Sequence, residues 1–206
     1  MESTQDLARG LPIGSVVVAE HQSAGRGRAG RTWEAPPRTA LLASFVLPFS
    51  PLASLAAGVA VAEACGPLAR LKWPNDVLLG DGKLAGILVE VRGEVAVVGV
   101  GLNLTWAPAG GALLGAEVDE LLPRLHESLT RWNAAPPAQV LERWRALSAT
   151  LGRRVRLELP GETLVGLAED VLPDGSLVVG GRAFAAGDVI HLRDAAAPAE
   201  PPPSGP

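Results

Sequence analysis

Residues 71–104 read LKWPNDVLLGDGKLAGILVEVRGEVAVVGVGLNL, a run of short apolar segments interrupted by tight turns. Val, Ile and Leu dominate the segments, which is typical of strands. The turns Gly80-Asp81-Gly82 and Arg92-Gly93-Glu94 are short enough to join neighbouring strands as hairpins. Strands are expected at residues 71–73, 77–79, 84–91 and 95–104. The run therefore predicts an α+β fold with a mainly antiparallel sheet backed by helices.

The segments on either side supply more strands and the covering helices. Further strands are expected at residues 15–21 and 40–47. Helices are expected at residues 4–9, 51–65, 118–132 and 138–151, with Ser50 as a cap for the second of them. Residues 51–65 are apolar nearly all round, so this helix should be buried against the sheet.

The chain changes character after Gly152. Short strands are expected at residues 155–159, 163–168, 176–179 and 189–192, which predicts a small all-β barrel. Residues 195–206 are rich in Pro and Ala and are expected to be a disordered tail. The predicted division is a catalytic domain at residues 1–151, a small domain at 152–194 and the tail.

Composition limits the classes of function. The 206 residues include 48% hydrophobic residues and carry a net charge of −4, which argues against a protein devoted to nucleic acid or to an anionic membrane. The one cysteine, Cys65, cannot form an internal disulfide, and Met1 leads into no secretory signal. Residues 51–65 are too short for a membrane span. We expect a cytoplasmic protein without a membrane partner.

Residues 25–33, GRGRAGRTW, set three arginines among three glycines. Glycine lets backbone N–H groups approach a ligand, and the arginine fork matches carboxylate and phosphate, so the segment predicts a flexible anion clamp. The plainer interpretation is a solvated surface loop. The pattern also matches G-x-G-x-x-G, but the following Glu34-Ala35-Pro36-Pro37 cannot continue a helix, which excludes a dinucleotide fold. A single-strand nucleic-acid segment remains a minor alternative.

The chain has 18 basic residues, and its two lysines, Lys72 and Lys83, lie in one short segment. This clustering predicts a site that needs a compact ammonium group. In Lys72-Trp73-Pro74-Asn75-Asp76 the adjacent amide and carboxylate suit hydrated Mg²⁺ or the polar groups of a nucleotide. The plainer interpretation is an Asx-type turn with Trp73 in the core.

Two further motifs lie in predicted strands. Lys83 opens one strand and is followed by the small residues Ala85 and Gly86. In Gly99-Val100-Gly101-Leu102-Asn103 the glycines predict that another group approaches the backbone. The three histidines lack metal-ligand spacing, and Ser44 and Ser54 lie in no nucleophile-elbow context.

Together, Gly25–Trp33, Lys72–Asp76, Lys83–Leu88 and Gly99–Asn103 resemble, in this order, the motifs of biotin protein ligases. Glu2-Ser3-Thr4-Gln5 resembles the acidic-Ser-Thr-Asn opening of that family, with Gln5 where Asn is usual. The resemblance is close over residues 2–106 and extends beyond them in layout only. It implies a class II synthetase-like catalytic fold with a small SH3-like C-terminal domain.

The resemblance implies a reaction in two steps. ATP, with Mg²⁺, activates biotin as biotinyl-5'-AMP, and the biotinyl group then passes to a lysine of the biotin carboxyl carrier domain of a biotin-dependent carboxylase. The loop at residues 25–33 would be disordered when empty and would close over the adenylate to exclude water.

Site residues follow from the same resemblance. The implied catalytic residues are Arg28, Lys83 and Asp76, with Asp76 also a ligand of Mg²⁺. The implied biotin-binding residues are Ser3, Thr4, Gln5, Gln22, Gly25, Arg26, Gly27, Arg28, Trp33, Lys83, Gly86 and Gly99. The implied ATP-binding residues are Arg28, Arg31, Trp33, Lys72, Asn75, Asp76, Lys83 and Asn103.

Three alternatives remain at this point. A lipoate-type ligase shares the fold and a strand-borne lysine. A nucleic-acid-binding protein would use the Arg-Gly loop, and a carboxylase accessory protein would have no activity. No helix-turn-helix segment precedes Ser3, so the resemblance is to monofunctional ligases without specific DNA binding, and it allows a homodimer.

Overall fold

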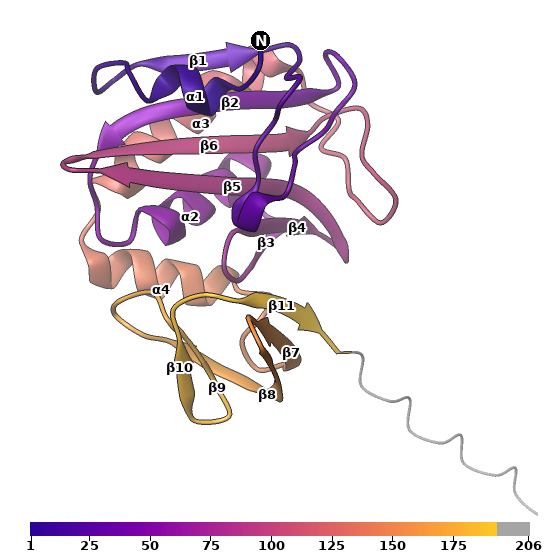
Figure 1. Ribbon diagram of the computed structural model, residues 1–206, viewed down its shortest axis with the longest axis vertical. Coiled ribbons are helices and arrows are strands. Elements are labelled where there is room, and N and C mark those ends of the chain that lie inside the picture. The colour runs from indigo at the N-terminus through magenta and orange to yellow at the C-terminus, as the bar shows by residue number, and fades with distance from the viewer. Residues whose placement is uncertain (193–206) are drawn as a thin grey trace, which may run out of the picture.

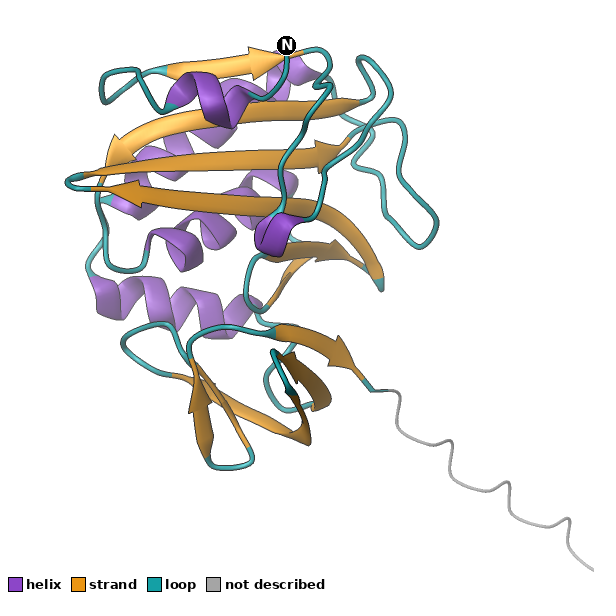
Figure 2. Ribbon diagram, viewed as in Figure 1, coloured by secondary structure: helices purple, strands orange, loops and turns teal. Residues whose placement is uncertain are grey.

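A computed structural model describes residues 1–192 of the chain, and the tail predicted at residues 195–206 lies outside them. The larger sheet has six strands with helices on both sides, and a smaller sheet lies beyond one end of it (Figures 1 and 2). The strands of the larger sheet are β1 (Val16–Ala19), β2 (Ala40–Pro48), β3 (Ala69–Lys72), β4 (Asp76–Leu79), β5 (Gly82–Arg92) and β6 (Val95–Asn103). The predicted α+β class is confirmed.

The strand order in the larger sheet is β1-β2-β6-β5-β4-β3, and every neighbouring pair is antiparallel. The two turns within residues 71–104 do join consecutive strands, as predicted, because each allows the chain to reverse within a few residues. In the central β5–β6 hairpin Gly86 lies opposite Gly101, and Leu88 lies opposite Gly99. This register brings three glycines together at the middle of the sheet.

The helices are α1 (Thr4–Ala8), α2 (Ala53–Cys65), α3 (Val118–Asn133) and α4 (Pro137–Leu147). Helices α2 and α3 cover one face of the larger sheet, while α1 and the loop between β1 and β2 cross the opposite face (Figure 2). Within residues 1–192 no helix combines the length and apolarity that a membrane crossing needs.

Two predicted helix ends were wrong. Ser50 does not cap α2, because the helix begins at Ala53 and its N-cap position is Leu52, which makes no side-chain cap hydrogen bond. Ser50 lies in the preceding turn, where its carbonyl accepts from Ala53 N. Helix α4 ends at Leu147 and not at residue 151. Ser148 has extended backbone, and its Oγ accepts hydrogen bonds from the N–H groups of Thr150 and Leu151, which turns the chain out of the helix.

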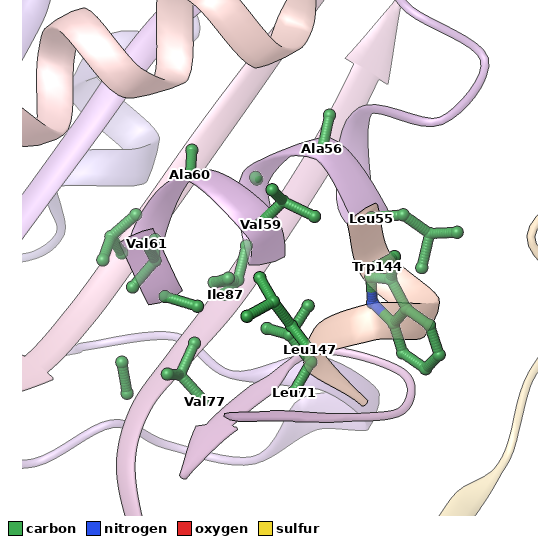
Figure 3. Close-up of a cluster of buried hydrophobic side chains, with 14 of the residues drawn as sticks. Leu55, Ala56, Val59, Ala60, Val61, Leu71, Val77, Ile87, Trp144 and Leu147 are labelled. Carbon is green, nitrogen blue, oxygen red and sulfur yellow. The ribbon is translucent and has the colours of Figure 1, made fainter. Parts of the chain in front are cut away.

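Helix α2 is buried on several sides, as its apolar sequence predicted. Figure 3 shows its side chains packed among the sheet and α4. The labelled members of the cluster are Leu55, Ala56, Val59, Ala60 and Val61 of α2, Leu71, Val77 and Ile87 of the sheet, and Trp144 and Leu147 of α4. Small residues on α2 let the sheet approach closely: a methyl group on Gly58 would lie 3.4 Å from Leu71.

The smaller sheet contains β7 (Arg154–Leu159), β8 (Glu162–Val171), β9 (Leu177–Val179), β10 (Arg182–Phe184) and β11 (Asp188–His191). Its order is β10-β9-β8-β7-β11, so within the described residues the sheet is open and the closed barrel expected from the sequence is not formed. The outer strands have three and four residues, too few to meet and close it. Strand β10 was missed; its sequence Arg182-Ala183-Phe184 has no run of β-branched residues like that of the equally short β9.

Trp73, which precedes β4, forms hydrogen bonds with the smaller sheet and with the segment that leads into it. The backbone N–H of Trp73 donates to Thr150 Oγ1 at 3.1 Å, and its indole Nε1 donates to the carbonyl of Gly175 at 3.1 Å. Trp73 is 2% exposed, so both donors need these acceptors. Trp73 therefore connects the turn that carries Asn75, and the start of β4 at Asp76, to the smaller sheet.

Candidate active site

The Arg-Gly loop, residues 25–33, forms a hairpin across the face of the larger sheet that α2 and α3 leave free (Figure 1). Trp33 N donates to the carbonyl of Gly25 at 3.0 Å, and Gly27 N donates to the carbonyl of Arg31 at 2.7 Å. At the tip, Ala29 and Gly30 have positive φ values of 53° and 74°. The loop therefore has a defined closed arrangement in which it lies over the sheet.

Two glycines of the sheet make room for the indole ring of Trp33. A methyl group on Gly86 would lie 2.9 Å from Trp33 Cζ3, and one on Gly101 would overlap the ring. The expectation that another group approaches these strands is confirmed, and the group is a side chain of the same protein. The indole Nε1 is buried and has no hydrogen-bond partner among the described residues.

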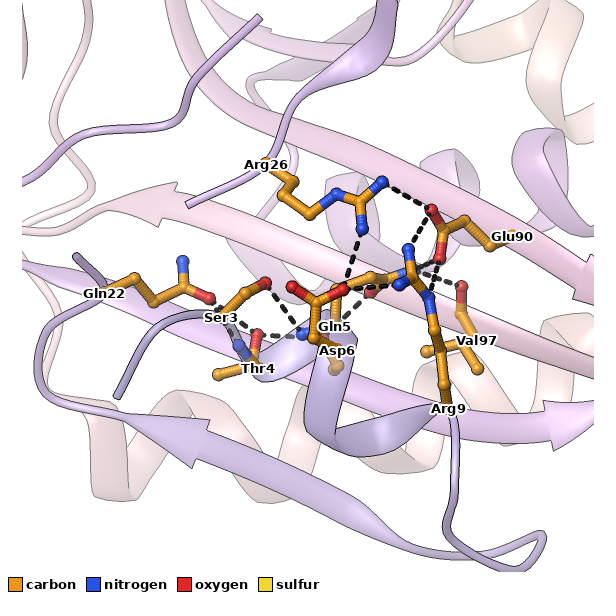
Figure 4. Close-up of polar contacts among 10 residues, drawn as sticks. Ser3, Thr4, Gln5, Asp6, Arg9, Gln22, Arg26, Glu90 and Val97 are labelled. Carbon is orange, nitrogen blue, oxygen red and sulfur yellow. Dashed lines mark hydrogen bonds and ion pairs between the residues drawn. The ribbon is translucent and has the colours of Figure 1, made fainter. Parts of the chain in front are cut away.

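A third glycine lies under a row of polar side chains. A methyl group on Gly99 would lie 2.5 Å from Gln5 Oε1. Gln5 Nε2 donates to the carbonyl of Val97 at 3.1 Å, and Gln5 Oε1 accepts from Ser44 Oγ at 3.0 Å (Figure 4). Thr4 Oγ1 lies 2.9 Å from Ser44 Oγ and donates to Gln22 Oε1 at 3.0 Å.

This row carries both donors and acceptors, and Thr4, Gln5 and Ser44 in it are nearly fully buried. Ser3 completes it, because its Oγ accepts from Gln5 N at the start of α1. Ser44 belongs to the row although the sequence offered it only as an unsuitable nucleophile. The sequence feature that could have identified Ser44 is its position as a lone hydroxyl residue in an otherwise apolar strand.

The cations of the loop are paired with oxygens of the protein. Arg26 Nη1 lies 2.7 Å from Asp6 Oδ1, and Arg26 Nη2 lies 3.4 Å from Glu90 Oε1 (Figure 4). A hydrogen bond from Arg9, together with the charges of Arg9 and Arg26, lowers the pKa of Glu90. Arg28 Nη1 donates to Asn75 Oδ1 at 3.1 Å.

The strand-borne lysine is paired in the same way. Lys83 Nζ lies 2.7 Å from Asp76 Oδ1 and 5.6 Å from the centre of the Trp33 ring. Lys83 thus touches both the segment Lys72–Asp76 and the Arg-Gly loop, the two motifs that the sequence set apart. The ammonium group is held between a carboxylate and an aromatic face.

Arg28 is the loop cation most affected by its surroundings. Burial lowers its pKa, and the nearby charge of Arg31 lowers it further, while Asp188 and Asp76 raise it. Desolvation disfavours the guanidinium charge, so an anion bound beside Arg28 would be favoured.

A cavity of about 120 Å³ lies between the loop and the sheet. The predicted site residues that line the cavity are Ser3, Thr4, Gln5, Gln22, Arg26, Gly27, Arg28, Arg31, Trp33, Asn75, Lys83, Gly86 and Gly99. The lining residues that the sequence analysis did not name as site residues are Thr32, Ala43, Ser44, Ile87, Leu88, Val100 and Gly101.

Four predicted residues lie outside this cavity. Gly25 closes the base of the hairpin, and Asp76 reaches the site through Lys83. Asn103 donates to the carbonyls of Lys83 and Ala112 and lines a neighbouring cavity, which shares Thr32, Trp33 and Lys83 with the first. Lys72 lies opposite Asp76 on β3 and lines neither cavity.

Residues 2–105 match the Biotin/lipoate A/B protein ligase family, and residues 150–192 match the Biotin protein ligase C terminal domain. The chain is 43% identical to a biotin--[acetyl-CoA-carboxylase] ligase of Mycobacterium tuberculosis, over 87% of this chain and 80% of that protein. It is 36% identical to the protein of the same name from Paracoccus denitrificans, over 86% of this chain and 88% of that one.

A solved structure shares the fold. The biotin acetyl coenzyme A carboxylase synthetase from Helicobacter pylori with bound biotinylated ATP is 26% identical, has a TM-score of 0.74, and is matched over 89% of this chain and 95% of that one.

Proposed function

The chain belongs to the biotin/lipoate A/B protein ligase family, and from this premise we propose that it is an ATP-dependent biotin protein ligase. It activates biotin as biotinyl-5'-AMP and transfers the biotinyl group to a lysine of a biotin carboxyl carrier domain. The observation that carries the proposal is the meeting of Arg28 and Lys83 at one cavity, beside the polar row of Thr4, Gln5 and Ser44.

The first step joins two anions. A carboxylate oxygen of biotin bonds to the α-phosphorus of ATP, and the bond from that phosphorus to the bridging oxygen breaks to release pyrophosphate. Arg26, Arg28 and Lys83 offset the repulsion between the two reactants, and their fixed positions avoid a rearrangement during the reaction. In the second step a lysine amine attacks the acyl carbon, AMP leaves, and the amine loses a proton as the amide forms.

The polar row suits the ureido ring of biotin, which has both N–H and C=O groups. The side chains of Ser3, Thr4, Gln5 and Gln22 supply donors and acceptors at one end of the cavity. Gly86 and Gly99 let the side chains of Trp33 and Gln5 lie close against the sheet at the site. Trp33 covers the apolar part of the ligand, and Gly25 and Gly27 let the loop fold over it.

The nucleotide is assigned to the other end of the same site. The predicted ATP-binding residues that line the cavity are Arg28, Arg31, Trp33, Asn75 and Lys83, and Asn103 lines the adjoining cavity. The role of Lys72 in ATP binding stays a prediction, because Lys72 lines neither cavity.

A magnesium ion fits Asp76 as a single carboxylate ligand. Mg²⁺ is usually held by one or two carboxylates together with substrate phosphates, and the described residues contain no group of three or more acidic, His or Cys side chains that would hold a metal alone. The ion would neutralise charge on the phosphates, and Asp76 would place it beside Lys83.

The polar row also favours biotin over lipoate. The dithiolane ring of lipoate has no N–H or C=O groups, so it could form none of the hydrogen bonds that the polar row offers to a ureido ring. A nucleic-acid-binding role is not favoured, because Arg26 and Arg31 are already paired with carboxylates and the net charge is −4.

One assay separates the candidates. Purified protein, ATP and Mg²⁺ are incubated with either biotin or lipoate and an apo carrier domain, and the mass of the carrier and the release of pyrophosphate are followed. We expect a mass gain that depends on biotin and ATP. A gain with lipoate alone would overturn the assignment, and a protein without enzymatic activity would release no pyrophosphate.

We also propose a division into domains, a cellular compartment and an oligomeric state. The two sheets support a catalytic domain at residues 1–151 and a C-terminal domain at 152–194. The single cysteine supports a place in the reducing cytoplasm. A homodimer stays a prediction that sedimentation equilibrium tests, and the lack of specific DNA binding stays one that a salt-resistant promoter shift would contradict.

A further inference from the structure

The tip of the Arg-Gly loop contacts the smaller sheet. Arg31 Nη2 lies 2.8 Å from Oδ1 of Asp188, the first residue of β11. Asp188 is held in place by backbone pairing opposite Glu158 of β7. Among the ion pairs of the described residues, this one joins the loop to the smaller sheet, and Asp188 does not line the cavity.

Arg31 transmits this contact to the rest of the loop tip. Its Nε donates to the carbonyl of Arg28 at 3.2 Å, and its own carbonyl accepts from Gly27 N at 2.7 Å. The same residue therefore closes the hairpin from both its side chain and its backbone. Fixing the guanidinium of Arg31 fixes the turn that carries Arg28.

Charge supplies a second reason for the contact. Arg28 and Arg31 are like charges at one tip. Burial is the main cause that lowers the pKa of Arg28; the charge of Asp188 raises this pKa, and the charge of Arg31 lowers it. Asp188 thus offsets the repulsion that would otherwise separate the two guanidinium groups in the empty protein.

The smaller sheet is a firm support for such a contact. Trp73 is held by Thr150 and by the carbonyl of Gly175, and Asn75, two residues further on, accepts the hydrogen bond from Arg28. The loop tip is therefore held on two sides by parts of the protein that are fastened to each other.

We propose that Asp188 is a positioning residue, which holds the Arg-Gly loop closed over the cavity through Arg31. It touches no reacting atom in this role. Resting on the proposed ligase function, the consequence is that Asp188 keeps the acyl-adenylate in the site until the carrier lysine arrives, because an open loop admits water and lets the intermediate leave.

Hydrogen exchange in the empty protein tests the positioning role without any substrate. The N–H groups of Gly27 and Trp33 are bonded inside the hairpin and report its opening, whereas the N–H of Ala24 is bonded to Glu2 outside it. In Asp188→Ala we expect exchange at Gly27 and Trp33 to become about 2- to 5-fold faster, the range that an exposed ion pair supports. Exchange at Ala24 and the melting temperature should not change.

Glu158→Ala is the matched control, because Glu158 lies opposite Asp188 and pairs with Arg156 and with no loop residue. Its loop exchange should equal that of the unchanged protein. Arg31→Gln also removes the hydrogen bond from Arg31 Nε to the carbonyl of Arg28, so its loop exchange should be at least as fast as in Asp188→Ala. The double variant should exchange no faster than Arg31→Gln alone. Equal loop exchange in Asp188→Ala and the unchanged protein, or additive effects in the double variant, would overturn the proposal.

A second measurement separates this proposal from the ligase function. Without carrier, the fraction of biotinyl-adenylate found free in solution should rise in Asp188→Ala by a similar factor, and biotin affinity should stay within about twofold. Adenylate formation with no rise would contradict the positioning role alone. Absence of adenylate in every variant would contradict the ligase function, and the exchange result would still stand by itself.

Discussion

The indole ring of Trp33 lies so close to Gly101 that a methyl group on this glycine would overlap the ring. The two residues come from the Arg-Gly loop and from the centre of β6. The contact sets the height at which the loop lies above the sheet, and with it the space available to a ligand.

Gly101→Ala should push Trp33 and the loop away from the sheet. An added methylene in a packed site costs about 1–3 kcal/mol, so we expect biotin affinity to fall about tenfold or more in isothermal titration calorimetry. Gly10→Ala is the control, because a methyl group there meets nothing within 4 Å. Unchanged biotin affinity in Gly101→Ala would show that Trp33 does not pack against Gly101 when biotin is bound.

The two lysines should differ sharply in their importance. Lys83 lines the cavity and Lys72 does not, so Lys83→Met should lower the rate of pyrophosphate release by about 100-fold or more, as expected for a preorganised charge. Lys72→Met should lower it less than about 10-fold. Both variants should be checked for an unchanged melting temperature. An equal loss of pyrophosphate release in both variants would instead support the role in ATP binding that the sequence predicted for Lys72.

Shortening Gln5 should destabilise the protein. In Gln5→Asn the amide would no longer span from Val97 to Ser44, and buried groups left without a partner cost about 1–3 kcal/mol. Urea denaturation should show this loss. Gln139→Asn, at an exposed position of α4, should leave stability unchanged. A stable Gln5→Asn variant would mean that the row tolerates the residue usual in this family.

Stability should fall as the pH drops toward 4, in part because of His191. The pKa of His191 is lowered to about 4, chiefly by burial and also by the charges of Lys72 and Arg153, while the charge of Asp81 opposes this shift. The unfolded chain takes up this proton near its ordinary value of 6.5, so between these values the unfolded state binds more protons. Urea midpoints at pH 7 and pH 5 should therefore differ less in His191→Asn than in the unchanged protein. An identical difference would exclude His191 as a contributor.

Local sequence was sufficient for the hairpins β4–β5 and β5–β6 of the larger sheet. The turns at residues 80–82 and 92–94 connect strands that are neighbours both in sequence and in space, so their pairing needed no long-range information. The glycines of β6 showed that something approaches the strand. Helix ends were less predictable, because Ser50 and Ser148 use their polar groups in turns that compete with helix capping and continuation.

Contacts between distant segments could not be predicted from spacing. No local pattern shows that Ser44 meets Thr4 and Gln5, which are about forty positions earlier. Arg31 and Asp188 are 157 positions apart, and each alone is an ordinary exposed charge. The resemblance to a known family supplied the residues of the site, and the structure adds which of them lie together.

The indole N–H of Trp33 has a consequence for selectivity. It is buried without an acceptor among the described residues, and such a donor costs the protein about 1–3 kcal/mol. A molecule that offers an oxygen or sulfur acceptor at this point would be held more tightly because it removes an existing penalty, quite apart from any new attraction. The empty loop thus holds an unsatisfied hydrogen-bond donor, and this donor would discriminate between two ligands of equal size and charge that differ by a single acceptor atom.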